Sequence, residues 1–164
     1  MHPLSTDETL LESANARVVA EREMAVSAEQ LFATLVDERS WTEVSGAIRK
    51  VTWTSSKPFA VGTTRTVVFM GGITIEEQFW VWEPNSCMGF AVTASSTRWL
   101  RGLVELYEIT PITSERCKMR WLLAVSLSGW LGRIEVGIAR MFQRNQRQML
   151  AKLERVAANF SSPA

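Results

Sequence analysis

The segment 129–160, GWLGRIEVGIARMFQRNQRQMLAKLERVAANF, decides the fold of this chain. Its apolar positions recur at spacings of three and four residues, which is the pattern of one amphipathic helix. The stripe consists of Ile134, Ile138, Met141, Asn145, Met149, Leu153, Val156 and Phe160, with arginines mostly on the other side. The segment therefore predicts a single long helix at the end of the domain.

The sequence before this helix, from residue 17 to residue 128, reads mainly as strands and turns. Alternating polar and apolar residues over 17–26 predict a first strand. Ser27 and Gln30 have the spacing of a capping box, which predicts a short helix to about Asp37 and a second helical turn over 38–44. Further strands are predicted at 48–55, 63–70, 74–83, 88–95, 104–110 and 117–128. Because turns and no helices separate these strands, we expect a curved, seven-stranded antiparallel sheet in an α+β fold.

Composition sets limits on the function. The chain has 164 residues with a net charge of +1, which suits one domain and gives no electrostatic reason to expect nucleic acid or a membrane as partner. Residues 1–16 are expected to form a flexible tail and residues 17–160 the single domain. His2 is the only histidine, so neither a histidine-based triad nor a His/Cys metal site is expected, and no cofactor is predicted. Cys87 and Cys117 are interpreted as free thiols of a cytoplasmic protein.

Several short motifs, taken in order, indicate a family. They are MAVSAEQLF at 24–32, VDERSW at 36–41, WVWEP at 80–84 and KMRW at 118–121. From about residue 18 to 158 the chain resembles the START and birch-allergen-type (SRPBCC) superfamily, in its polyketide cyclase/dehydrase and lipid-transport-like branch. The resemblance implies a helix-grip fold, in which the sheet and the last helix enclose a cavity. Most proteins of this kind bind or carry apolar molecules, and a minority are cyclases or dehydratases.

Strand alternation and the position of Pro84 in the family pattern suggest which side chains face the cavity. On strand 74–83 they favour the face of Glu76 and Gln78 over that of Ile75 and Glu77, although period two alone does not decide between them. The predicted ligand-binding residues are Trp41, Arg65, Val67, Phe69, Glu76, Gln78, Trp80, Trp82, Glu105, Tyr107, Met119, Trp121, Leu123, Ile138, Met141, Asn145 and Met149.

Six of these residues are polar, namely Arg65, Glu76, Gln78, Glu105, Tyr107 and Asn145. In one interpretation Arg65 orients a ligand oxygen while Glu76 or Glu105 acts as an acid or base whose pKa is raised by burial. In the other, Arg65 pairs with Glu76 across the hairpin and the remaining groups satisfy one another or point to water.

Three functions remain open. The first is a binder of a small hydrophobic or lipid-like molecule without catalysis, as a monomer or weak homodimer. The second is an aromatase/cyclase- or dehydratase-type enzyme acting on a polyketide-like substrate through Arg65, Glu76 and Tyr107. Cyclase-like relatives place an arginine deep in the pocket, where this chain has Phe69 and Met70, and that departure weighs against catalysis. The third is a protein–protein interaction module that uses the apolar stretch 99–104, which is equally well read as a lid with Trp99 partly exposed.

Overall fold

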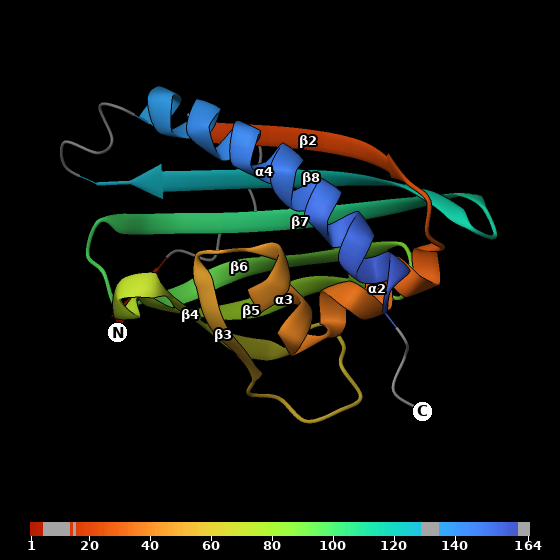
Figure 1. The fold of residues 1–164 in the computed structure, drawn as a ribbon. Coiled ribbons are helices and arrows are strands. Elements are labelled where there is room, and N and C mark those ends of the chain that lie inside the picture. Colours follow the sequence, from red (N-terminus) through yellow and green to blue (C-terminus); the bar gives the residue numbers. More distant parts are fainter. Residues whose placement is uncertain (5–13, 15, 129–134, 161–164) are drawn as a thin grey trace.

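A curved antiparallel sheet with one long helix laid across it forms the framework of the molecule (Figure 1). The computed structural model describes residues 1–4, 14, 16–128 and 135–160. The strands are β1 (His2–Pro3), β2 (Ala16–Met24), β3 (Ile48–Trp53), β4 (Thr64–Phe69), β5 (Thr74–Glu83), β6 (Cys87–Ser95), β7 (Leu100–Thr113) and β8 (Arg116–Leu127). The sheet order β2-β8-β7-β6-β5-β4-β3 has only antiparallel neighbours, as the sequence predicted.

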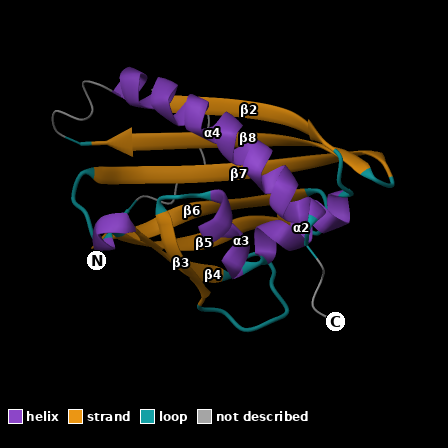
Figure 2. Ribbon diagram, viewed as in Figure 1, coloured by secondary structure: helices purple, strands orange, loops and turns teal. Residues whose placement is uncertain are grey.

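Two short helices, α2 (Ala28–Val36) and α3 (Glu38–Val44), follow β2. The capping box at the start of α2 is confirmed: Ser27 Oγ accepts from the Gln30 amide at 3.0 Å, and Gln30 Oε1 accepts from the Ser27 amide at 3.1 Å. Asp37 ends α2 and also caps α3, since its carboxylate accepts from the Ser40 amide at 2.9 Å. Because one extended residue joins the two helices, the chain turns sharply there and covers one end of the sheet (Figure 2).

The long helix α4 (Glu135–Ala158) lies on the same side of the sheet as α2 and α3 (Figure 2). The second half of α4 is packed tightly, with Leu150, Leu153 and Ala157 no more than 1% exposed. Met141, nearer the start of the helix, is 63% exposed. The helix is thus held firmly at one end, which leaves space under the other. No helix in the described part of the chain is long and apolar enough to cross a membrane.

One strand is much longer than the sequence predicts. β7 runs from Leu100 to Thr113, although a strand over 104–110 that stopped at Pro111 was expected. Pro111 is tolerated because β6 pairs with β7 only as far as Glu108, so the missing proline N–H leaves no gap in that ladder. Towards its other end, β6 pairs with β7 only to Ala91.

The free edge of β6 is used by the N-terminus. His2 and Pro3 pair with Ser95 and Ala94, and the Leu4 amide donates to the Thr93 carbonyl at 2.8 Å. The expectation that the whole segment 1–16 is a loose tail is therefore wrong for these first residues, and Ala16 already belongs to β2. Residues 5–13 and 15 of the predicted tail, and the predicted helix start at 129–134, lie outside the described residues.

Candidate functional site

A cavity of about 580 Å³ lies between the concave face of the sheet and the first half of α4. This volume is within the range of small-molecule sites. Its lining is mostly apolar and comes from β3 to β8, α3, α4 and the loops at the sheet edge. Eleven of the predicted residues line it, namely Trp41, Arg65, Val67, Phe69, Glu105, Tyr107, Trp121, Leu123, Met141, Asn145 and Met149.

The face of β5 that looks into the cavity is the opposite of the predicted one. Ile75 and Glu77 line the cavity, whereas Glu76 and Gln78 are exposed. The cause is the register of the β4–β5 hairpin, which pairs Arg65 with Glu77. That register follows from the short 3₁₀ turn η1 (Met70–Gly72), with Gly71 and Gly72 at φ near +76° and +78°. Opposed residues share a face, so the expected Arg65–Glu76 pair does not form.

Two more predicted residues of β5, Trp80 and Trp82, do not line the cavity. Trp80 has no partner between the pairs Phe79–Phe90 and Val81–Gly89, so the alternation of β5 shifts by one residue there. Trp80 itself lies over Gly89 on the outer face. Trp82 turns inward, but it packs against Phe32, Trp53, Phe59 and Phe79 instead of lining the cavity.

The last two predicted residues are Met119 and Ile138. Met119 is fully buried in the core and does not line the cavity. The side chain of Ile138 lies outside the described part of the chain.

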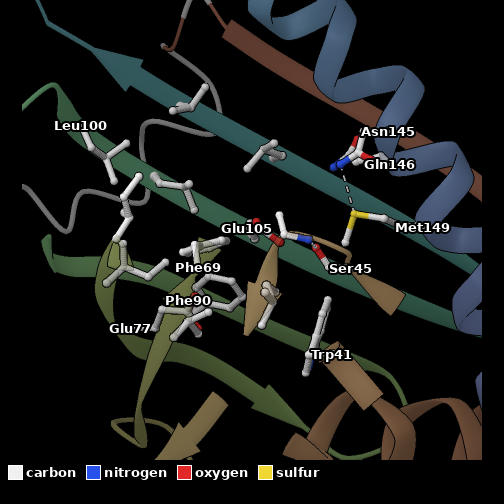
Figure 3. A pocket seen from close by; sticks show the side chains of 18 of the residues that line it. Trp41, Ser45, Phe69, Glu77, Phe90, Leu100, Glu105, Asn145, Gln146 and Met149 are labelled. Carbon is white, nitrogen blue, oxygen red and sulfur yellow. Dashed lines mark hydrogen bonds between the residues drawn. The ribbon is translucent and has the colours of Figure 1, made fainter. Parts of the chain in front are cut away.

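Five polar or aromatic side chains from the sheet form a cluster at the cavity. Figure 3 labels two of them, Glu77 and Glu105. The Glu105 carboxylate accepts from the Tyr107 hydroxyl at 2.5 Å and from the Trp121 indole N–H at 2.9 Å. Next to it, the Arg65 Nε donates to the Glu77 carboxylate in an ion pair whose side chains are 3% and 4% exposed. This cluster is the polar part of an otherwise apolar wall.

Aromatic rings surround the Arg65 guanidinium. Its central carbon lies 4.9 Å from the ring centre of Phe90, 5.1 Å from Phe79, and 5.4 Å from both Trp41 and Trp53. Cation–π contacts of this kind stabilise a charge that has been removed from water. The Arg65 Nη1 atom is nevertheless buried without a hydrogen-bond partner among the described residues.

Burial changes the protonation behaviour of both carboxyl groups. It raises the pKa of Glu105 to about 7, against the opposing effect of the hydrogen bonds from Tyr107 and Trp121. Burial also raises the pKa of Glu77, against the lowering effect of the Arg65 guanidinium. Glu105 can therefore donate or accept a proton near neutral pH.

The inner face of α4 also differs from the predicted stripe. Gln146, which was not predicted, lines the cavity and is 2% exposed, and Leu150 is fully buried. The contact face therefore keeps Met149 and Leu153 of the predicted stripe and adds Gln146 and Leu150 beside them. Gln146 lies three residues before Met149 and four before Leu150, and this spacing indicated in the sequence that Gln146 shares their face of the helix.

The rim of the cavity is apolar and accessible. Met70 is 51% exposed and Trp99 is 41% exposed, and both line the cavity. The expectation that Trp99 is partly exposed is confirmed. The neighbouring stretch is not an exposed patch, because Leu100 and Val104 are buried in β7 and Leu103 lines the cavity. The interaction surface proposed for 99–104 is therefore wrong.

A comparison with protein families identifies the family of this chain. A family model described as polyketide cyclase/dehydrase and lipid transport matches residues 15–158. Uncharacterized proteins from Mycobacterium tuberculosis and Mycobacterium bovis are 40% identical over 107 residues. These matches cover 65% of this chain and 64% of each relative, so they span less than two thirds of the relatives' length.

Solved structures share the fold at low sequence identity. A START superfamily protein from Mycobacterium smegmatis has a TM-score of 0.68 at 12% identity, over 88% of this chain and 99% of its own. The Zhui aromatase/cyclase from Streptomyces sp. R1128 has a TM-score of 0.70 at 11% identity, over 87% and 93%. Norcoclaurine synthase from Thalictrum flavum has a TM-score of 0.63 at 12% identity, over 99% and 98%. With the family match over residues 15–158 and the helix-grip fold, the chain belongs to the polyketide cyclase/dehydrase and lipid transport family.

Proposed function

We propose that this protein binds a small, mainly apolar molecule that carries at least one polar oxygen, in the cavity between the sheet and α4. The observation that carries the proposal is the cavity of about 580 Å³ with mostly apolar walls and a polar cluster on the sheet. Apolar surface removed from water supplies roughly 25 cal/mol for each Å². The walls would therefore supply most of the affinity, and the cluster would set the orientation.

Arg65 is the group best suited to hold the ligand oxygen. Its Nε is engaged by Glu77, whereas its Nη1 is buried with no partner among the described residues. A buried donor without an acceptor costs about 1–3 kcal/mol, and more when it is charged. A carbonyl, hydroxyl or phenolic oxygen of a ligand would remove that cost, so the site favours ligands with such a group over pure hydrocarbons.

The proposal is tested by filling the cavity. Leu123→Trp places a larger side chain at the cavity wall, and Leu122→Trp, one residue earlier on the outward-facing side of β8, is the matched control. We expect calorimetric titration to show 2-isopropylnaphthalene binding to the wild type and to Leu122→Trp. Leu123→Trp should bind the probe at least about tenfold more weakly, because the larger side chain takes up space that the bound probe needs. Overpacking of this kind costs about 1–3 kcal/mol. Equal affinity of both variants would place binding elsewhere and refute the proposal.

A second candidate function is an enzyme that dehydrates or cyclises a polyketide-like substrate. It is supported by Glu105, whose pKa near 7 and position at the cavity beside Tyr107 suit proton transfer. Glu76 cannot fill this role, because it is exposed on the opposite face of β5.

A β-hydroxy ketone, 3-hydroxy-1-(2-naphthyl)butan-1-one, is a suitable probe for this second function. An acid–base group would move a proton from the carbon next to the carbonyl while the hydroxyl leaves as water. The enone that forms is followed by its absorbance. Glu105→Gln should abolish this reaction while the affinity for 2-isopropylnaphthalene stays the same, and an unchanged rate in Glu105→Gln would exclude the enzymatic role.

A further inference from the structure

Gln146 is a buried polar residue that neither the fold nor the polar cluster on the sheet accounts for. It is 2% exposed and lines the cavity from α4, on the wall that faces the sheet (Figure 3). Both its Nε2 and its Oε1 are buried without a hydrogen-bond partner among the described residues. Each such atom costs about 1–3 kcal/mol in the free protein.

The neighbours of Gln146 do not relieve this cost. The neighbouring Asn145 Nδ2 donates to the Met149 sulfur at 3.3 Å, and no hydrogen bond joins Asn145 to Gln146. Leu150, Leu153 and Ala157, which follow Gln146 on the same side of α4, are buried and apolar. An apolar side chain at position 146 would continue this stripe, so the amide is not explained by packing.

The chemistry of the primary amide defines the partner that would fit. Its N–H group donates and its oxygen accepts. It is therefore satisfied by a planar group that carries one acceptor and one donor on two atoms bonded to the same carbon. A carboxamide, a lactam or a protonated carboxylic acid has this arrangement. An ionised carboxylate has only acceptors and would set its charge against Gln146 Oε1.

We propose that Gln146 forms a second polar subsite, on α4, which binds a neutral donor–acceptor group of the ligand: a carboxamide, a lactam or a protonated carboxylic acid. The proposal rests on the proposed binding function and adds the ligand class. The ligand would present this group to α4, and a second oxygen could reach Arg65 on the sheet. Both polar walls border the same cavity.

Two probes of the same shape test the subsite. 2-Naphthamide and 2-isopropylnaphthalene differ in that a carboxamide replaces an isopropyl group. Gln146→Met keeps the length of the side chain but removes both polar atoms. Gln143→Met, at an exposed glutamine of the same helix, is the matched control. In calorimetric titrations we expect Gln146→Met to bind 2-naphthamide about tenfold more weakly, the loss of one or two buried hydrogen bonds. Its affinity for 2-isopropylnaphthalene should be unchanged or higher, and Gln143→Met should match the wild type with both probes.

The outcomes separate this inference from the proposed function. An equal change in affinity for both probes overturns the subsite and leaves the binding function standing. A wild type that binds the hydrocarbon but not the amide overturns the subsite and the oxygen preference ascribed to Arg65, while binding of apolar molecules in the cavity stands. A wild type that binds neither probe overturns both. A thermal melt of the free protein adds an independent check: Gln146→Met should melt at a higher temperature than the wild type, because it removes two unpaired polar atoms. A lower melting temperature would show that Gln146 is paired in the free protein and would overturn the proposal.

Discussion

The sharpest consequence of the polar cluster is a pH-dependent stability that one substitution removes. Burial raises the pKa of Glu105 from its ordinary value of 4.5 to about 7. The folded protein therefore holds this proton more tightly than the unfolded chain does. Between these two values the folded state binds more protons, so the free energy of unfolding falls as the pH rises. Glu105 thus favours folding most at low pH, and this contribution is lost as the pH rises through about 7.

The magnitude follows from the difference between the two pKa values. At about 1.4 kcal/mol per pKa unit, it corresponds to roughly 3 kcal/mol, of which about 2.5 kcal/mol falls between pH 5 and pH 8. Glu105→Gln keeps an oxygen that accepts from Tyr107 and Trp121 but carries no titratable proton. The variant should lose this part of the pH dependence and gain stability relative to the wild type as the pH rises.

Urea unfolding at pH 5, 6, 7 and 8, followed by tryptophan fluorescence, measures this difference. The stability of Glu105→Gln relative to the wild type should increase by about 2.5 kcal/mol from pH 5 to pH 8. Glu76→Gln, at an exposed carboxylate of β5, is the control. Its free energy of unfolding should change with pH in the same way as that of the wild type. If the free energies of unfolding of Glu105→Gln and the wild type also change in parallel with pH, burial does not raise the pKa of Glu105 and the reasoning is wrong.

Three further predictions concern packing and the cavity rim. Arg65→Met should lower the free energy of unfolding by about 3–5 kcal/mol, because it leaves Glu77 buried without its cation, and adding Glu77→Gln should recover part of the loss. Additive losses in urea unfolding would argue against a coupled pair. Gly89→Ala should cost about 1–3 kcal/mol, since a Cβ there would lie 2.8 Å from the Val81 side chain; an unchanged urea midpoint would contradict the close packing at the bulge. Trp99→Ala should speed the release of 2-isopropylnaphthalene in stopped-flow measurements, because Trp99 borders the cavity at its exposed rim, and an unchanged rate would remove Trp99 from the exit route.

Local signals in the sequence were sufficient for the helices and most strands. The capping box at Ser27 gave the start of α2, and the bounds predicted for α3 and β5 agree with the structure. The sequential motifs led to the family, which the family model confirms. These features depend on neighbouring residues or on the order of elements, so one sequence carries them.

The cavity wall was predicted less well, because it depends on register. Glu76 and Glu77 both sit in a strand whose two faces mix polar and apolar residues, so period two could not choose between them. The turn at η1 sets which one faces Arg65, and the bulge at Trp80 then shifts the alternation again. These errors on β5 arise from geometry of the folded chain that residue type alone does not encode. On α4 the predicted stripe left out Gln146, although its spacing to Met149 and Leu150 was visible in the sequence.

The central claim is that a small apolar molecule binds in the cavity between the sheet and α4. The NMR signals of the tryptophan indole N–H groups in a ¹⁵N-labelled sample test this claim most directly. Trp41, Trp99 and Trp121 line the cavity, whereas Trp80 lies on the outer face of the sheet. On titration with 2-isopropylnaphthalene, we expect the indole signals of the three lining tryptophans to shift with one common affinity while that of Trp80 stays in place. Shifts confined to Trp80, or the absence of any shift at saturating probe, would contradict binding in the cavity between the sheet and α4.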